Sequence, residues 1–118
     1  MKIIVLFLYL YSITINAHAD MIYPFHADTA YRNKVTAGLK AVKKSMSETE
    51  VIGLLGIPTD RKKTYDPTYM TKVVGYYLYY LLAQAKEKGS YDERAVEAVI
   101  VDFDSQGRVI GTRTIGLD

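Results

Sequence analysis

The segment Val73–Leu82 reads VVGYYLYYLL and consists almost wholly of β-branched, aromatic and leucine residues. Residues of these types favour an extended backbone, so the segment is predicted to be a strand. Successive side chains of a strand point to opposite faces, and both faces of this one are therefore apolar. A strand of this kind has to lie within a sheet, with at least one face covered by other elements of the chain.

The region before this strand carries two helical patterns. Asp28–Lys44 has apolar residues at spacings of three and four, and Asp28 is suited to the N-cap position. Ser47 and Glu50 form a capping-box pattern that opens a second, shorter helix, which Gly56 and Pro58 end. The two helices form a hairpin joined at residues 45–47. The predicted core face of the first helix is Tyr31, Val35, Leu39, Val42 and Met46.

The segments that follow favour further strands. Asp60–Tyr65 is predicted to be an edge strand, and Ala95–Phe103 and Arg108–Ile115 are predicted to form a hairpin around a turn at residues 104–107. Ala83–Arg94 is polar and is predicted to be a loop, with a helical turn at its start as the alternative. Asp20–Pro24 is predicted to be a short leader. Two helices followed by strands predict an α+β fold, with a two-helix hairpin packed on a three- to four-stranded antiparallel sheet.

The first nineteen residues have the pattern of an export signal. Lys2 gives a basic start, residues 3–15 are mostly apolar, and Ala17 and Ala19 form a small-x-small cleavage site. The apolar run is shorter than the roughly 20 residues that a membrane-spanning helix needs. We therefore expect cleavage after residue 19, a single domain over residues 20–118 and a periplasmic location. The alternative is an uncleaved anchor.

Composition narrows the possible functions. The chain has no Cys and a formal net charge of +2. It therefore offers no thiolate as a nucleophile or metal ligand, and such a small net charge does not favour binding to nucleic acid. No segment after the predicted signal is apolar enough to cross a membrane.

Three segments resemble a known family. Ser45–Pro58 reads SMSETEVIGLLGIP and resembles the G-M-T-x-x-x-V-x-x-L-L-G-x-P signature of the SmpA/OmlA family, the BamE-type small subunit of the outer-membrane protein assembly machinery. Tyr76–Tyr80 resembles the tyrosine-rich second strand of that family, and Val101–Val109 resembles its v-x-F-D-x-x-G-x-V hairpin. The resemblance covers roughly residues 42–115, which is most of the chain after the predicted signal.

This resemblance implies two helices on a three-stranded antiparallel sheet, and a binding or scaffolding role rather than catalysis. Similar domains occur in tandem in secreted β-lactamase inhibitor proteins. The chain departs from the family pattern at two positions. Ser45 stands where glycine is usual, and Asp20 stands where family members of the assembly machinery usually carry a lipidated Cys.

The tyrosines of the central strand are the main candidate for a binding surface. Alternation places Tyr77 and Tyr79 on one face, together with Gly75, and Tyr76 and Tyr80 on the other. Exposed tyrosine is enriched at protein interfaces, whereas a tyrosine-lined core is the structural alternative. We expect Tyr77, Tyr79 and Gly75 to lie on the face that the helices leave open, where a glycine would leave room for a partner.

A second candidate surface is basic. These side chains are suited to anionic lipid headgroups or an acidic partner, or simply keep the surface of the protein soluble. The residues are Lys40, Lys43, Lys44, Arg61, Lys62 and Lys63, with Arg32 nearby in the sequence.

No catalytic or metal-binding set stands out. His26 is the single histidine after the predicted signal, and Asp104 is better suited to starting a turn than to holding a metal. Glu97 and Asp102 have an odd spacing that places them on opposite faces of one strand. The leading hypothesis is a non-catalytic periplasmic interaction module without a cofactor, which binds an envelope protein. A secreted enzyme inhibitor is the alternative, and a small hydrolase is a remote one.

Overall fold

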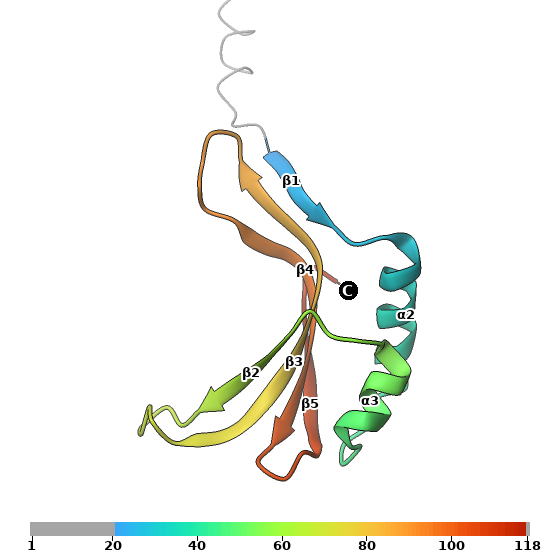
Figure 1. Cartoon of the computed structure of the whole chain (residues 1–118), viewed down its shortest axis with the longest axis vertical. Helices are drawn as coiled ribbons and strands as arrows, with labels where there is room; N and C mark the ends of the chain where they lie inside the picture. Colours follow the sequence, from blue (N-terminus) through green and yellow to red (C-terminus); the bar gives the residue numbers. More distant parts are fainter. Residues whose placement is uncertain (1–20, 118) are drawn as a thin grey trace, which may run out of the picture.

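The computed structural model describes residues 21–117, so the predicted signal and its cleavage site lie outside the described residues. The fold is α+β, as predicted, with two helices on one face of an antiparallel sheet of five strands (Figure 1). The elements in chain order are β1 (Met21–His26), α2 (Thr29–Leu39), α3 (Glu48–Leu55), β2 (Asp60–Tyr65), β3 (Val73–Glu87), β4 (Arg94–Asp104) and β5 (Val109–Ile115).

The long strand β3 organises the sheet. β4 pairs along one edge of β3 and is followed outward by β5. The other edge of β3 is shared by two strands, because β2 pairs with its first half and β1 pairs with residues 83–87. The sheet therefore has one strand more than the upper limit of the predicted three or four.

Two predictions about local structure were wrong, and they are linked. Residues 83–87 continue β3 instead of forming a loop or helical turn, and Met21–His26 forms β1 instead of a leader. Residues 83–85 of β3 pair with β4, and β1 pairs with residues 83–87. This backbone pairing overrides the weak strand preference of alanine, lysine and glutamate.

The first helix is shorter than predicted. Asp28 caps it, since its Oδ1 accepts a hydrogen bond of 2.8 Å from the backbone N–H of Tyr31. The helix ends at Leu39 rather than Lys44, because the next backbone N–H groups bond to carbonyls three residues back and the chain turns. Neither helix of the described region has the length and apolar character needed to cross a bilayer.

The second helix matches its prediction. The Ser47 hydroxyl accepts from the backbone N–H of Glu50, and the Glu50 carboxylate accepts from the backbone N–H of Ser47, which completes the capping box. Gly56 ends the helix with φ of 91°, a conformation in which other residues are strained.

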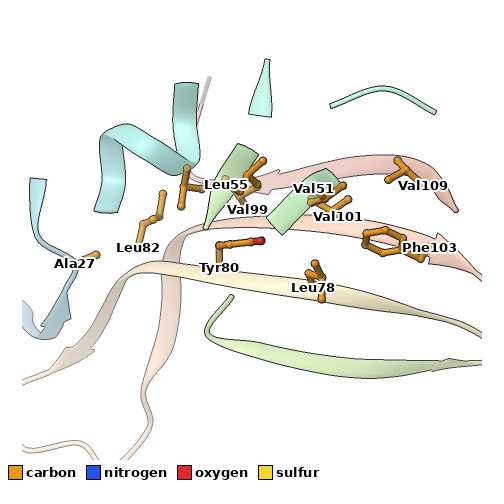
Figure 2. Close-up of a cluster of buried hydrophobic side chains, with 11 residues drawn as sticks. Ala27, Val51, Leu55, Leu78, Tyr80, Leu82, Val99, Val101, Phe103 and Val109 are labelled. Atoms are coloured by element: carbon orange, nitrogen blue, oxygen red, sulfur yellow. The ribbon is translucent and has the colours of Figure 1, made fainter. Parts of the chain in front are cut away.

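The core lies between the helices and the sheet (Figure 2). β3 contributes alternate residues to it, as β4 does (Figure 2). Both helices cover the core on one side of the sheet (Figure 1). Because side chains alternate along both strands, this packing fixes which face of the sheet the helices cover. The buried members are Ala27, Val35, Val51, Leu55, Leu78, Tyr80, Leu82, Val99, Val101, Phe103 and Val109.

The two helices approach each other closely at Gly38 of α2. A Cβ at this position would overlap the backbone carbonyl of Leu54 in α3. Gly53, by contrast, lies in α3 with open space around the position of its missing Cβ. The two glycines therefore differ in whether the packing requires them.

This difference predicts opposite effects of the same substitution. Gly53→Ala should raise the free energy of unfolding by about 0.5–1 kcal/mol, because alanine lowers the entropy cost of helix formation. Gly38→Ala should lower it by about 1–3 kcal/mol, because the helices must move apart. Urea denaturation of both variants measures the two effects. Equal effects would contradict this account of the helix contact.

The turn between the helices contains a strained residue. Ser45 has φ of 73°, the one positive value at a non-glycine position within residues 21–117. Its backbone N–H donates to the carbonyl of Val109 over 2.9 Å, which ties the turn to β5. Ser45 is also where the SmpA/OmlA signature has glycine. The departure from the signature therefore falls at a position whose backbone conformation favours glycine.

We expect Ser45→Gly to stabilise the protein by about 0.5–1 kcal/mol, because it relieves a left-handed backbone at the cost of some chain entropy. Ser105→Gly is the matched control, since Ser105 is also an exposed turn serine but lacks a positive φ. Thermal or urea unfolding would report the difference. A Ser45→Gly variant no more stable than wild type would rule out the proposed strain.

Candidate functional site

The face of the sheet that points away from the helices is the candidate binding surface, here called the open face. Its centre is Tyr77 and Tyr79 of β3, which alternate with the buried Leu78 and Tyr80. Cross-strand partners share a face, so pairing adds neighbours from the other strands. These neighbours are Asp60 and Lys62 of β2, Ile100 and Asp102 of β4, and Arg113 of β5.

The tyrosines of the open face are half-buried rather than fully exposed. Ile100 lies between Tyr79 and Arg113 in the pairing register and is only 7% exposed. The long side chains beside it therefore cover an apolar layer. Partial burial also raises the pKa of the Tyr79 hydroxyl, which favours the neutral phenol that can donate a hydrogen bond.

A charged pair borders the tyrosines. The Arg113 guanidinium binds the Asp102 carboxylate through two hydrogen bonds, with Nε–Oδ2 at 2.8 Å and Nη2–Oδ1 at 2.9 Å. The Cζ atom of Arg113 also lies 5.5 Å from the ring centre of Tyr77. The hydrogen bonds to Asp102 raise the pKa of Arg113 and fix its plane. The open face thus combines aromatic rings with an oriented guanidinium.

The other two tyrosines of β3 lie on the helix side. Tyr76 stacks on Phe103 with ring centres 4.9 Å apart, and Arg61 lies 3.9 Å above the Tyr76 ring. Tyr80 is completely buried, and its hydroxyl donates a hydrogen bond of 2.8 Å to the carbonyl of Gly56. Tyr80 therefore serves the core and is not available to a partner, whereas Tyr76 is half-buried and packs against the edge of the core.

The packing of the sheet explains why position 75 is a glycine. It is buried on β3, and a Cβ there would overlap the carbonyl oxygen of Phe103 on β4. The close approach of the two strands accounts for the glycine, in place of the expected space for a partner.

The basic residues fall on separate segments. Lys40, Lys43 and Lys44 lie at and beyond the end of α2, whereas Arg61, Lys62 and Lys63 lie on β2. Two of the β2 residues have acidic neighbours, since Arg61 Nε lies 2.9 Å from Glu48 Oε1 and Lys62 Nζ lies 4.0 Å from Asp60 Oδ2. Within residues 21–117, Lys63 and the three lysines near α2 form no ion pair with another side chain of that range.

The acidic residues have structural partners. Glu97 pairs with Arg32 of α2 and Asp102 with Arg113 of β5, so the two carboxylates lie on opposite faces of β4, as predicted. Asp104 accepts hydrogen bonds from the backbone N–H groups that follow it in the turn, which also matches its prediction. Within residues 21–117, no group of three or more His, Asp or Glu side chains is placed to hold a metal ion.

Sequence reasoning did not single out Arg113 or Ile100. The sequence does contain a signal for these two residues. Gly107 marks the turn between β4 and β5, and counting residues outward from this turn along both strands gives an approximate pairing register. A bulge between Asp102 and Phe103 shifts that register by one residue, which is why the Arg113–Asp102 contact does not follow from simple counting.

Comparison with known proteins finds similarity among solved structures. No family model and no curated protein matches the chain. Among solved structures, the chain is similar to the X-ray structure of an osmotically inducible lipoprotein, OsmE. The two chains share 27% sequence identity over 72% of this chain and 73% of the other, with a TM-score of 0.46.

The buried hydroxyl of Tyr80 predicts a pH-dependent stability. Burial raises the pKa of Tyr80 above its value of about 10 in the unfolded chain. The neutral phenol therefore stabilises the fold below pH 10, and this contribution is lost as pH rises beyond about 10. Tyr80→Phe should be less stable by about 1 kcal/mol at pH 7, because the bond to Gly56 is lost.

Urea denaturation of both proteins between pH 7 and 11 tests this, and the difference between them should shrink above pH 10. Tyr91→Phe is the control, because this ring is 98% exposed and should contribute nothing to stability at pH 7. A difference that stays constant with pH would contradict the role of the Tyr80 phenol.

Proposed function

We propose that this chain is an exported, non-catalytic interaction module of the SmpA/OmlA type, which binds an envelope protein in the periplasm through the open face of its sheet. Its first nineteen residues have the pattern of an export signal, and residues 45–58 and 101–109 resemble the family motifs, with Ser45 in place of the usual glycine. The α+β architecture agrees with the fold that this resemblance implies.

The observation that carries the proposal is the composition of the open face. Tyr77, Tyr79 and Arg113 lie together on a rigid antiparallel sheet, and neither helix covers them. Tyrosine and arginine are the residue types that most often dominate binding energy at protein interfaces. A sheet also holds them in place before binding, which lowers the entropy cost of association.

The second candidate function is inhibition of an enzyme, with the open face as the surface that binds the target. Such a protein would also bind through rigid aromatic anchors, and the partner's identity distinguishes the two functions. The lysines at and after α2 add a further proposed contact, with anionic lipid headgroups at the outer membrane. They support it because they form no ion pair with residues 21–117.

Site-specific cross-linking in cells tests the open face directly. A photo-reactive phenylalanine derivative placed at Tyr79 should capture a discrete envelope protein, whereas the same group at Tyr91 should not. Tyr91 is a suitable control because it is an exposed tyrosine in the loop between β3 and β4. The same products from both positions, or none from Tyr79, would argue against this surface.

The captured partner then allows a quantitative test. The double variant Tyr77→Ala/Tyr79→Ala should weaken its binding by about 2 kcal/mol or more, which is about 30-fold. Circular dichroism must show that the variant remains folded, because the two rings cover Ile100. Unchanged affinity in a folded double variant would reject the open face as the binding surface.

A further inference from the structure

The sheet has three outer strands, and two of them carry features that oppose pairing with another chain. Within residues 21–117, β1, β2 and β5 each pair with a neighbouring strand on one side only. β1 contains Pro24, and its pairing is irregular between Ile22 and Phe25. The first four residues of β2, at positions 60–63, are all charged. Proline, irregular pairing and rows of charge are the usual means by which an outer strand avoids a further partner.

The outer edge of residues 110–114 of β5, here called the β5 edge, lacks such protection. The residue before it is covered, because Val109 exchanges two backbone hydrogen bonds of 2.9 Å with the turn between the helices. The β5 edge itself reads IGTRT, and no strand within residues 21–117 pairs with its outer side. Its one charged side chain, Arg113, is held by Asp102 of β4 through two hydrogen bonds. This ion pair neutralises the charge that would otherwise repel a second strand.

The side chains of the β5 edge are accessible on both faces of the sheet. Thr112 and Thr114 pair with buried valines of β4 and so lie on the helix side, yet both are exposed. Gly111 and Arg113 lie on the open face. A Cβ at Gly111 would meet open space, so the packing within one copy does not require a glycine there. The glycine leaves room beside β5 for a side chain of another strand.

The sequence of the β5 edge fits a second copy of itself in one register. The edge is bounded by the covered Val109 and by the end of the strand at Ile115, and its middle residue is Thr112. Antiparallel pairing about Thr112 places the two threonines opposite each other, and such β-branched pairs are favourable. Pairing about Arg113 would instead place two like charges opposite each other, which is destabilising.

The register about Thr112 also matches charge with space. It places Arg113 of each copy opposite Gly111 of the other, where the open space can receive the long side chain. Asp102 is the β4 neighbour of Gly111 in the pairing register. Each guanidinium therefore points across the glycine toward a carboxylate of the other copy, and opposite charges on neighbouring strands attract.

We propose that a second copy of this chain occupies the β5 edge, in antiparallel pairing centred on Thr112. The two five-stranded sheets then form one continuous sheet, with both pairs of helices on the same side and the two open faces side by side. A single strand pair buries less area than the roughly 1,200–2,000 Å² of a stable interface, so the dimer is reversible, with a dissociation constant on the order of tens of micromolar. This proposal does not depend on the function proposed for Tyr77 and Tyr79.

Sedimentation velocity tests the dimer, with the protein expressed from its full coding sequence and purified. The sedimentation coefficient should rise toward that of a dimer between about 5 and 500 µM, which brackets the expected dissociation constant. Thr112→Lys should weaken dimerisation by about tenfold or more, because the symmetric register places two lysines opposite each other. Thr68→Lys is the matched control, since Thr68 is an exposed threonine between β2 and β3. It should leave dimerisation unchanged.

Single-cysteine variants test the register, since the chain has no Cys of its own. Opposite residues of an antiparallel pair have Cα atoms about 4.5–5.5 Å apart, which a disulfide can span. Oxidised glutathione should therefore convert Thr112→Cys into a covalent dimer. Thr114→Cys is the control, because its two copies would lie about 13 Å apart in this register. Its covalent dimer should form about tenfold more slowly or not at all.

Several results would overturn the proposal. These are a protein that stays monomeric up to about 1 mM, a dimer that a folded Thr112→Lys variant leaves intact, or equal rates of disulfide formation in the two cysteine variants. Circular dichroism reports whether each variant is folded, and the cysteine pair decides the matter if Thr112→Lys is not. A monomeric protein that is cross-linked in cells from position 112 to a different envelope protein would assign the β5 edge to that protein instead.

Discussion

The burial of alternate β3 side chains under the helices is the constraint on which the rest of this structure depends. Leu78, Tyr80 and Leu82 are completely buried against α2, α3 and β4. Fully burying an aliphatic side chain of this size contributes roughly 1.5–3 kcal/mol. Because a strand alternates, this packing also decides which residues stay on the opposite face, so the position of Tyr77 and Tyr79 follows from the core.

Tyr80 connects the core to the surface. Its ring packs under the helices while its hydroxyl holds the carbonyl of Gly56, the residue that ends α3. The loop that begins there presents Ile57 to solvent. A change in core packing near Tyr80 is therefore expected to alter this surface loop, although the open face lies on the other side of the sheet.

Helices and strands whose own residues favour their conformation could be predicted from the sequence. Segments that are extended only because they pair with strands far away in the sequence could not. The capping box and Gly56 gave the limits of α3, and composition gave the start of β3. Residues 83–87 have no strand signal of their own, because β1 and β4 impose their extended form. The alternation of side chains along β3 correctly placed Tyr77 and Tyr79 on the face opposite to Tyr76 and Tyr80. The Arg113–Asp102 pair escaped prediction because a bulge shifts the register between β4 and β5.

The pairing of β1 with the end of β3 has a consequence for folding. Met21 pairs with Glu87, so β1 closes the longest loop of the sheet, whereas β3, β4 and β5 are joined by short turns. Contacts of low sequence separation form first, so we expect the β3–β4–β5 meander and the helical hairpin to assemble before β1 docks. Until then β1 is an unattached apolar segment, and Pro24 within it limits pairing with other chains, since proline has no N–H to donate.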